Sequence, residues 1–583
     1  MNILGLSAFY HDSAAVILVN GKIVAACQEE RFTRLKHDKS FPINSIKFCL
    51  SQANLELKDI DYICFYEKPF LKFERLLETF ITYAPFRGFK TFIKFIPSWL
   101  EYKLNLKSYI KKQFKLIEPL GLSAKNKLMF SYHHLSHASS AYYPSPYVEA
   151  AVLCVDGVGE WETTSTWQAK GSQITPVEKI NFPHSLGLLY SAFTYYCGFK
   201  VNSGEYKLMG LAPYGEPKYK DIILKKLIDL KEDGSFRLNM KYFSFPHSER
   251  MINGKFEKLF NKTARAPESE MEIFYKDIAA SIQKCLEIIL LKLVNSLHDK
   301  VGGDNLCLAG GVALNCVANS VLLGKSKFKN IWVQPAAGDA GGALGAALLV
   351  WHSYLGNDKS AKDVMQGCYL GSSYSEKESA RQLNELGAVY ERLSDEELFS
   401  RAVDSLDSDK ILGWFSGRME YGPRALGARS ILADARSPGM QKTLNLKIKF
   451  RESFRPFAPI TLNKNNKFKF KGSSPYMMFT AKVNADDMPA ITHLDKSARL
   501  QTIDESNGPV FGLLSQFYKK TGCDTLINTS FNVRGEPIVE SPQDAYLCFM
   551  NTHMDALVID NFYLKKSEQV NNVPLPAPEF IMD

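Results

Sequence analysis

Apolar and polar positions near the start of the chain predict a β-hairpin. Apolar runs cover residues 3–8 and 14–19, and Asn20-Gly21 forms a tight turn before a third run at 22–27. Later runs of strand length are followed by segments with apolar residues at helical spacing. We predict a helix at 44–53, strands at 60–66 and 128–132, a helix at 133–142, a strand at 150–156, a helix at 273–297, a strand at 306–309 with a helix from Val312, and a strand at 331–334 with a helix from Ala340. This alternation predicts an α/β fold of βα units.

A polar, weakly patterned stretch at 355–375 divides the chain into two predicted domains. A chain of 583 residues is also too long for one hydrophobic core. We predict a first domain at 1–355 with a helical insertion at 68–125, a second domain at 376–565 and a tail at 566–583. Strands of the second domain are expected at 410–415, 476–482 and 556–563, and the proline-rich residues 573–583 are expected to be extended.

Composition and charge argue against several classes of protein. The 71 basic and 62 acidic residues give a net charge of +9, which suits anionic small substrates at least as well as nucleic acid. The 11 cysteines contain no CxxC pair, which argues against a zinc knuckle or a disulfide framework. No apolar run reaches the roughly 18 residues of a membrane helix, and the N-terminus lacks signal-peptide features. We therefore expect a cytoplasmic protein with no membrane or nucleic-acid partner.

A basic, aromatic stretch at 90–115 is the main local excess of charge. Such a stretch could bind RNA or a membrane surface. We favour a helical insertion whose lysine stems lie along its surface.

The sequence also contains a candidate metal site. His133 and His137 are four residues apart on a predicted helix, which puts both imidazoles on one face. His134 points more to the side and is left out. Asp156 and Asp339 each follow a predicted strand, where an open α/β sheet faces its ligand crevice. Two imidazoles and two carboxylates suit iron, manganese or zinc, although the histidines could instead cap or pack.

Glycine-rich turns between strands and helices point to a nucleotide site. They carry Gly310 and Gly311, Gly341, and Gly157, and the loop around His11 is a further candidate contact. Glycine lets a backbone approach phosphate closely, and a helix N-terminus favours anions. Each turn alone is more often only a tight turn. Together they suggest the fold of actin, the heat-shock ATPases and the sugar kinases, since the P-loop and Rossmann motifs are absent.

The second predicted domain is rich in arginine. Gly417 to Ser430 and Asn445 to Pro459 hold arginines among glycine, proline and aromatic residues, followed by Arg499 and by Asn528 to Asn532. Arginine binds phosphate oxygens through two parallel hydrogen bonds, whereas lysine acts as a point charge. A solvated basic face is the alternative. We favour a phosphate or acyl-phosphate pocket.

Several motifs together resemble one family. They are the run from Ile3 to Ala14, His133-His134-Leu135-Ser136-His137-Ala138, Asp156 to Glu160, Gly204 to Gly215, Ala309 to Asn315, Tyr421 to Gly427, and Asn528 to Asn532. The chain resembles the NodU/CmcH carbamoyltransferases, whose members modify nodulation factors, cephamycin, novobiocin and tobramycin. The resemblance covers nearly the whole chain except about residues 68–125.

The resemblance implies an actin-like first domain, similar to the tRNA threonylcarbamoyl-transferase domain, that holds the metal, usually Fe²⁺, and ATP with Mg²⁺. Metal ligands would be His133, His137, Asp156 and Asp339. Nucleotide contacts would be Gly157, Lys207, Gly310, Gly311, Asn315 and Gly341. A YrdC-like α/β second domain would bind carbamoyl phosphate through Arg424, Lys449, Arg455, Arg499, Asn528 and Ser530.

The implied reaction makes carbamoyl-adenylate from carbamoyl phosphate and ATP and passes its carbamoyl group to the hydroxyl of a small-molecule acceptor. A hydroxyl of high pKa needs a base; His11 is the candidate and Asp12 the second choice. A tRNA threonylcarbamoyl-transferase and a non-catalytic actin-like nucleotide sensor are the alternatives. The acceptor and a homodimeric state stay open.

Overall fold

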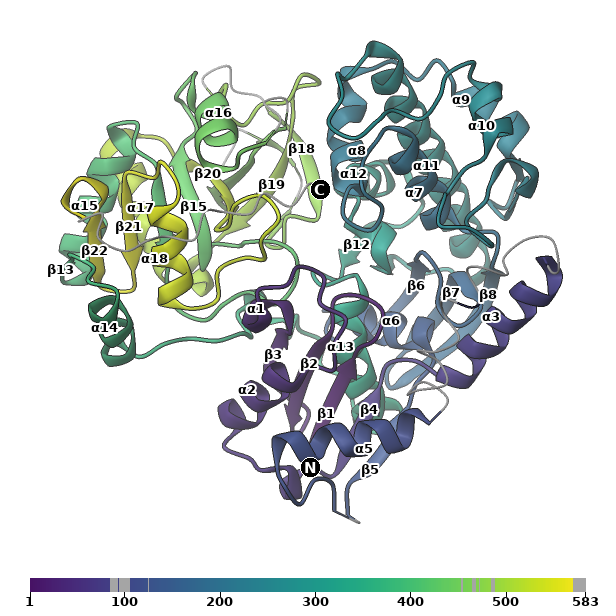
Figure 1. The fold of residues 1–583 in the computed structure, drawn as a ribbon, viewed down its shortest axis with the longest axis horizontal. Coiled ribbons are helices and arrows are strands. Elements are labelled where there is room, and N and C mark those ends of the chain that lie inside the picture. The colour runs from purple at the N-terminus through teal and green to yellow at the C-terminus, as the bar shows by residue number, and fades with distance from the viewer. Residues whose placement is uncertain are drawn as a thin grey trace. The chain divides into compact units, whose positions relative to one another are not determined.

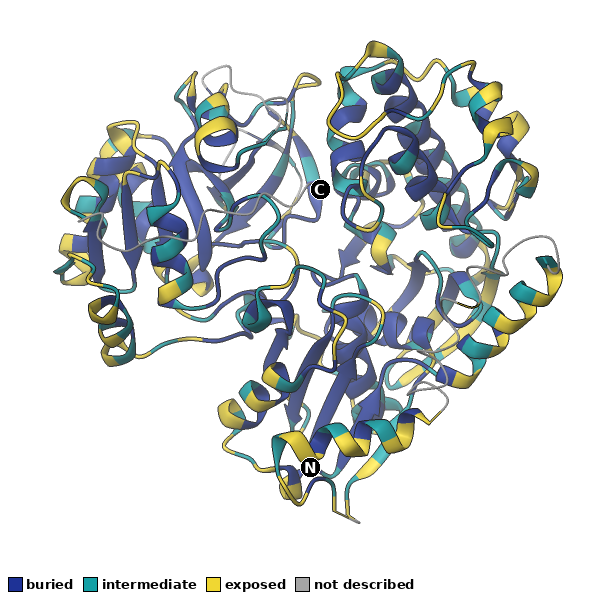
Figure 2. Ribbon diagram, viewed as in Figure 1, coloured by how far each residue is buried: buried dark blue, intermediate teal, exposed yellow. Residues whose placement is uncertain are grey.

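The structure is a computed structural model of the chain. It describes residues 1–83, 93, 105–123, 125–451, 455–463, 468–470, 472–483 and 488–569. Figure 1 shows the ribbon, and Figure 2 shows that the strands are mostly buried while helices expose their outer faces. In these ranges no helix combines the length and the apolar character that a membrane span requires.

The chain forms two compact units. Unit 1 comprises Met1–Glu29 and His37–Val364, and unit 2 comprises Glu30–Lys36 and the chain from Met365 onward. The passage between them at Val364 falls inside the polar stretch 355–375. Nothing in the sequence indicated that Glu30–Lys36 would pack with unit 2.

The first of two five-stranded sheets among the described residues of unit 1 is built on the N-terminal hairpin. Its order is β3-β2-β1-β4-β5; β1–β2 and β2–β3 are antiparallel, whereas β1–β4 and β4–β5 are parallel. The strands are β1 (Asn2–Ser7), β2 (Ala14–Val19), β3 (Lys22–Gln28), β4 (Tyr62–Phe65) and β5 (Lys127–Phe130). The central strands read as nearly unbroken apolar runs because both of their faces are covered.

The second sheet repeats this arrangement. Its order is β8-β7-β6-β11-β12, again with two antiparallel pairs followed by two parallel pairs. The strands are β6 (Glu149–Val155), β7 (Glu162–Lys170), β8 (Gln173–Asn181), β11 (Asn305–Ala309) and β12 (Asn330–Val333). The prediction of an α/β fold is confirmed. The doubled sheet is consistent with the expected actin-like architecture, although the sequence shows no internal repeat.

Two helices lie between the sheets. α13 (Asp339–Leu349) packs on β1 and β2, α6 (His133–Tyr142) packs on β6 and β11, and the two helices pack against each other. Their crossing is close: a Cβ at Gly345 would lie 1.8 Å from Ser136 O, so only glycine fits. Around the sheets lie α2 (Ile43–Ala53), α5 (Leu106–Ile117), α11 (Ile273–Val301) and α12 (Cys316–Lys325).

The described part of the predicted insertion at 68–125 is helical. It contains α3 (Pro69–Tyr83) and α5; residues 84–92, 94–104 and 124, and with them much of the basic stretch 90–115, lie outside the described residues. The other elements of unit 1 are α7 (Leu186–Tyr196), α8 (Glu205–Leu211), α9 (Lys220–Ile222), α10 (Gly254–Leu259), β9 (Ile228–Leu230) and β10 (Phe236–Leu238).

Unit 2 is organised on one mixed sheet and is an α/β domain, as expected. The order is β13-β22-β21-β14-β15-β20-β16-β19-β18-β17. The strands are β13 (Glu391–Arg392), β14 (Leu412–Phe415), β15 (Arg429–Asp434), β16 (Ala458–Leu462), β17 (Phe468–Lys469), β18 (Phe479–Val483), β19 (Ser497–Ile503), β20 (Thr525–Ser530), β21 (Ala556–Ile559) and β22 (Phe562–Lys565). The helices are α1 (Glu30–Thr33), α14 (Glu376–Glu385), α15 (Asp395–Asp407), α16 (Met440–Thr443), α17 (Pro509–Thr521) and α18 (Pro542–Met550).

Two predicted elements differ from the structure. The single strand expected at 556–563 is a hairpin, because Asp560 adopts a φ of 47° and turns the chain between β21 and β22. The helix expected from Val312 begins at Cys316, after a 3₁₀ turn. Of the expected tail at 566–583, residues 566–569 pack on unit 2, where Lys566 Nζ donates to Met550 O (2.9 Å). The segment expected to be extended, 573–583, lies outside the described residues.

Candidate functional site

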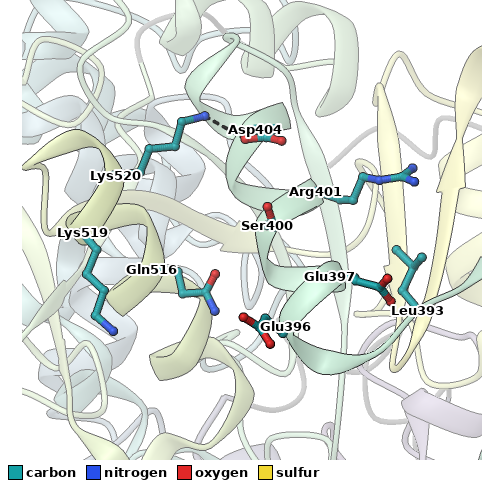
Figure 3. Close-up of a pocket in the computed structure, with 9 residues that line it drawn as sticks. All are labelled: Leu393, Glu396, Glu397, Ser400, Arg401, Asp404, Gln516, Lys519 and Lys520. Atoms are coloured by element: carbon teal, nitrogen blue, oxygen red, sulfur yellow. Dashed lines mark hydrogen bonds and ion pairs between the residues drawn. The ribbon is translucent and has the colours of Figure 1, made fainter.

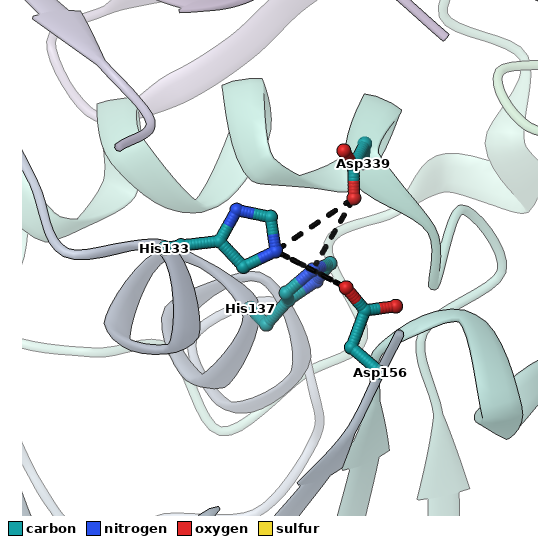
Figure 4. A group of neighbouring side chains, drawn as sticks. All are labelled: His133, His137, Asp156 and Asp339. Atoms are coloured by element: carbon teal, nitrogen blue, oxygen red, sulfur yellow. Dashed lines mark hydrogen bonds and ion pairs between the residues drawn. The ribbon is translucent and has the colours of Figure 1, made fainter. Parts of the chain in front are cut away.

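Four side chains converge between the two five-stranded sheets of unit 1, and Figure 4 shows them pointing toward one another. His133 Nε2 lies 3.1 Å from His137 Nε2 and 3.2 Å from Asp156 Oδ2. Asp339 Oδ1 lies 3.8 and 3.7 Å from these two imidazole nitrogens. All four side chains are buried, and their facing atoms lie within 4.8 Å of one another. They are the four side chains that the sequence indicated.

Local structure explains the convergence. α6 begins at His133, so His137 follows one turn later on the same face. Asp156 directly follows β6, and Asp339 is the first residue of α13. The end of β6 and the start of α13 therefore both lie beside the first turn of α6.

The charges of the cluster are strongly coupled. Burial lowers the pKa of His133, but the carboxylates of Asp339 and Asp156 outweigh it and raise that pKa to about 9. Burial works against ionised Asp156, yet the neighbouring imidazoles hold the pKa of this carboxyl well below its usual range. Two buried carboxylates thus need positive charge nearby.

The cluster fits a divalent cation. Asp339 Oδ1 is buried and has no hydrogen-bond donor among the described residues. An ionised oxygen in that condition is costly unless a cation lies beside it. Two imidazole nitrogens and two carboxylate oxygens suit iron, manganese or zinc.

Three neighbours shape this cluster. His134 Nδ1 turns away to Ser165 Oγ at 2.7 Å, which agrees with leaving it out of the ligand set. Both carboxylate oxygens of Glu160 lie 3.0 Å from the backbone N–H of His133 and so cap the start of α6. The Tyr66 hydroxyl donates to Asp339 Oδ2 at 3.4 Å. The sequence analysis assigned no role to Glu160 or Tyr66. Glu160 is the last residue of the motif that begins at Asp156, and Tyr66 is the last residue of the strand predicted at 60–66.

The loop between β1 and β2 lies beside the cluster. His11 Nδ1 is 3.0 Å from Asp12 Oδ2 and 4.0 Å from Asp339 Oδ2. Burial lowers the pKa of His11, but Asp339 and Asp12 raise it to about 10. Burial also acts against ionised Asp12, yet hydrogen bonds from His11 and His37 lower its pKa far below the usual value. So acidic a carboxyl is a weak base, which favours His11 over Asp12 for that role.

The glycine turns border the same region. Gly310 has a φ of 87°, and a Cβ there would lie 2.3 Å from Val155 O. The backbone N–H of Gly311 donates to Asp156 Oδ1 at 2.9 Å and thereby orients a candidate metal ligand. A Cβ at Gly341 would lie 2.1 Å from Ala336 O, whereas one at Gly157 would meet no described atom within 4 Å.

The other two predicted nucleotide contacts are engaged within the fold. Asn315 Oδ1 caps α12 by accepting from the backbone N–H of Ala318 at 3.0 Å, and its amide pairs with Gln283. Lys207 is buried in α8, with its ammonium 5.8 Å from the centre of the Phe199 ring.

In unit 2, strand alternation collects polar side chains on one face of the sheet. Asn528 and Ser530 are two apart on β20, and Arg499 and Gln501 are two apart on β19. Asn528 Nδ2 donates to Gln501 Oε1 at 2.7 Å, so the two pairs share a face. Asn528 Nδ2 also lies 3.2 Å from Ala425 O, which brings the loop that carries Arg424 next to this face.

Lys449 completes this group. Its Nζ donates to Ser530 O, to Ser530 Oγ (3.3 Å) and to Asn532 Oδ1 (2.9 Å). Burial, together with Arg451 and Arg455, lowers the pKa of Lys449 well below its usual value. Arg455 is joined to the segment before Lys449 through its carbonyl, which accepts from Asn445 Nδ2 at 2.9 Å.

Two arginines of the predicted pocket region donate hydrogen bonds to backbone carbonyls. Arg418 donates to Leu370 O at 2.7 Å, and Arg429 is buried and donates to Gly417 O at 3.0 Å. Both guanidinium groups therefore stabilise backbone segments of unit 2. Sequence alone does not separate these structural arginines from Arg424.

A surface pocket of about 770 Å³ in unit 2 includes none of the predicted residues. Figure 3 shows its lining, which lies on α15 and α17 except for Leu393, with Lys520 directed to Asp404 at 2.8 Å. Acidic and basic side chains are mixed there, so the pocket favours neither anions nor cations.

Comparison with known proteins identifies the family of the chain. A family model described as "Carbamoyltransferase N-terminus" matches residues 2–348, and one described as "Carbamoyltransferase C-terminus" matches residues 403–566. The Synechocystis "Uncharacterized protein sll1178" is 54% identical over 97% of each chain. Nodulation protein NolNO of Sinorhizobium fredii is 34% identical over 96% of this chain and 80% of its own.

Solved structures offer more distant similarity. Component A of the (R)-2-hydroxyglutaryl-CoA dehydratase of Acidaminococcus fermentans covers 61% of this chain and 99% of its own, with 16% identity and a TM-score of 0.32. The two family models together match most of the chain, and the resemblance seen in the sequence is confirmed. The chain therefore belongs to the carbamoyltransferase family of enzymes.

Proposed function

We propose that the enzyme makes carbamoyl-adenylate from carbamoyl phosphate and ATP and transfers its carbamoyl group to the hydroxyl of a small-molecule acceptor. Water must release phosphate from carbamoyl phosphate to give carbamate. The carbamate oxygen then attacks the α-phosphate of ATP, and pyrophosphate leaves. In the second step the acceptor oxygen attacks the carbamoyl carbon, AMP leaves, and the hydroxyl proton passes to a base.

The polar face of unit 2 is suited to the first step. Arg424, Arg455 and Arg499 would bind phosphate oxygens through paired N–H groups. Lys449 and Ser530 lie next to each other, so both can hydrogen bond one anion. Binding an anion would also favour the charged form of Lys449, which burial otherwise disfavours.

The four-residue cluster of unit 1 is suited to the second step. His133, His137, Asp156 and Asp339 would hold the metal, Fe²⁺ or another divalent ion. When bound, such an ion polarises an oxygen. It also offsets the carboxylate charge that keeps the pKa of the His11 imidazole high. Neutral His11 would then take the hydroxyl proton while Asp12 orients its ring, as carboxylate–histidine pairs do. The backbone amides of the glycine turns would hold the nucleotide phosphates, with Mg²⁺.

One observation supports this proposal most. The buried cluster, in which Asp339 Oδ1 accepts no hydrogen bond from the described residues, lies directly beside His11, whose imidazole is bound to Asp12. An actin-like protein that only binds nucleotide does not need this arrangement. The acceptor would be a sugar, an antibiotic, a toxin or a polysaccharide hydroxyl, and no nucleic acid is expected.

The direct test supplies ATP with and without carbamoyl phosphate. We expect pyrophosphate release only when both are present, and its loss in Arg455→Ala. A mass-spectrometric screen of hydroxylated compounds should then find one that gains a single carbamoyl group. Pyrophosphate release that does not depend on carbamoyl phosphate would refute the proposal.

A further inference from the structure

His37 lies outside every motif that the sequence singled out, yet its imidazole reaches the His11 loop. His37 Nδ1 is 2.8 Å from Asp12 Oδ1, while Asp12 Oδ2 is 3.0 Å from His11 Nδ1. We propose that His37 is a positioning residue for carbamoyl transfer: it holds the Asp12 carboxylate in the orientation that fixes the ring of His11. The inference rests on the proposed function, because that function makes His11 the base.

The direction of these hydrogen bonds follows from chemistry. An ionised carboxylate can only accept, so the Nδ1 atoms of His11 and His37 must both donate. A neutral His11 then carries its proton on Nδ1 and its lone pair on Nε2. The tautomer that can accept a hydroxyl proton is thus set by Asp12.

Two contacts hold a carboxylate more firmly than one. With His11 as its only partner, the Asp12 carboxylate could rotate about its Cβ–Cγ bond. With an imidazole on each oxygen, rotation breaks one of the two hydrogen bonds. His37 therefore limits the orientations available to Asp12 and, through it, to His11.

The backbone brings these residues together at a cost. Asp12 has a φ of 52° and His37 a φ of 58°, in the left-handed region that residues other than glycine seldom adopt. The two segments are joined directly, since the N–H of Ser13 donates to Asp38 O at 2.9 Å. Such strained residues persist when surrounding contacts determine them, and they cluster at functional sites.

His37 is not needed to fill the core. Its side chain is 35% exposed, so removing it should leave the chain folded. This permits two variants that both tolerate a positive φ. His37→Gly removes the ring, whereas His37→Asn keeps a donor, its Nδ2, near the position of the imidazole Nδ1.

Activity gives the first readout. Glycerol at high concentration serves as the probe acceptor, with carbamoyl-glycerol measured by mass spectrometry and the rate of His11→Ala subtracted. We expect His37→Gly to lower the kcat of transfer roughly 10- to 100-fold, the usual effect of misplacing a reacting group. KM for ATP and for carbamoyl phosphate should not change, and neither should carbamoyl-phosphate-dependent ATP–pyrophosphate exchange. His37→Asn should restore transfer.

The second readout does not need turnover. In protein labelled with ¹⁵N-histidine and loaded with zinc, the Nδ1–H proton of His11 is assigned by its loss in His11→Ala. We expect its resonance to broaden in His37→Gly and to recover in His37→Asn. Glycine in place of the exposed His553 is the control and should change neither readout.

The outcomes separate the two proposals. If the wild type shows no ATP–pyrophosphate exchange, the proposed function fails and the His11 resonance alone decides the role of His37. The positioning role is overturned if His37→Gly keeps both the rate and the resonance. It is also overturned if His37→Asn is as impaired as His37→Gly, or if exchange falls in step with transfer.

Discussion

At the residue scale, one position along a helix decides whether a histidine faces the cluster. His133 and His137 present Nε2 to each other at 3.1 Å, while His134, adjacent in sequence, binds Ser165 through Nδ1. A step of one residue rotates a side chain by about 100° around the helix axis. Burial lowers the pKa of His134 to about 3, so this ring is neutral.

This contrast predicts metal content. His137→Asn removes a candidate ligand nitrogen, and we expect bound metal to fall at least 10-fold, as measured by elemental mass spectrometry. His134→Asn is the matched control, because the asparagine amide can still reach Ser165. Equal metal content in both variants would refute the ligand assignment.

Lys449 gives a prediction about pH. Burial lowers its pKa in the free protein, and a bound anion would raise it again. Binding should therefore take up a proton, and affinity should fall as pH rises through the window between the two pKa values. Sulfate is a suitable probe because it does not titrate there. Calorimetry in two buffers of different ionisation enthalpy should show the uptake in the wild type and its loss in Lys449→Met.

At the element scale, the ends of strands and the starts of helices build the site. Asp156 follows β6, and Gly310 and Gly311 follow β11 beside it. Gly310 allows the chain to turn past Val155, and Gly311 then donates to Asp156 Oδ1. Neighbouring parallel strands of one sheet, such as β6 and β11, have their carboxyl ends at the same edge, so the turns that follow them lie side by side.

Two glycines in these turns should respond differently to alanine. Gly310→Ala should cost about 2–4 kcal/mol, combining an unfavourable positive φ with overlap against Val155 O. Gly157→Ala meets no described atom within 4 Å, so the fold should be nearly unaffected. Urea denaturation of both variants compares them. Similar midpoints would contradict the close approach at Gly310.

At the scale of the whole molecule, the chain leaves unit 1 at Glu29, contributes Glu30–Lys36 to unit 2, and returns at His37. Two arginines hold this short segment. Arg31 donates to Gly422 O at 2.9 Å, and Arg34 donates to Ile538 O at 2.7 Å and to Pro537 O at 3.0 Å. The segment is therefore part of the structure of unit 2 and ends directly before His37.

Removing one of these arginines should loosen unit 2 locally. Arg34→Ala leaves two carbonyls without their donor, and we expect a local loss of about 1–3 kcal/mol. Faster hydrogen exchange in peptides covering 533–545 of the full chain would report it. Arg381→Ala, which breaks only exposed ion pairs on α14, should change exchange little. Unchanged exchange in Arg34→Ala would contradict this role of the segment.

Much of the site was predictable from sequence, because some signals are local. A spacing of four on a helix fixes the relation of His133 to His137, and an acid after an apolar strand places Asp156 at the sheet edge. Glycine at Gly310 reflects a backbone conformation that other residues avoid. The α/β class follows from hydrophobic periodicity in the same way.

Other features depended on tertiary structure. The roles of His37, Glu160 and Tyr66 at the site depend on contacts between residues 25 to 273 positions apart in sequence. No local pattern encodes such contacts. The repeated sheet order and the membership of Glu30–Lys36 in unit 2 were likewise invisible in sequence. The sequence by itself thus determined which residues are the candidate ligands of a metal and of an anion. Tertiary structure decided which atoms face one another, because hydrogen bonding and burial act through space rather than along the chain.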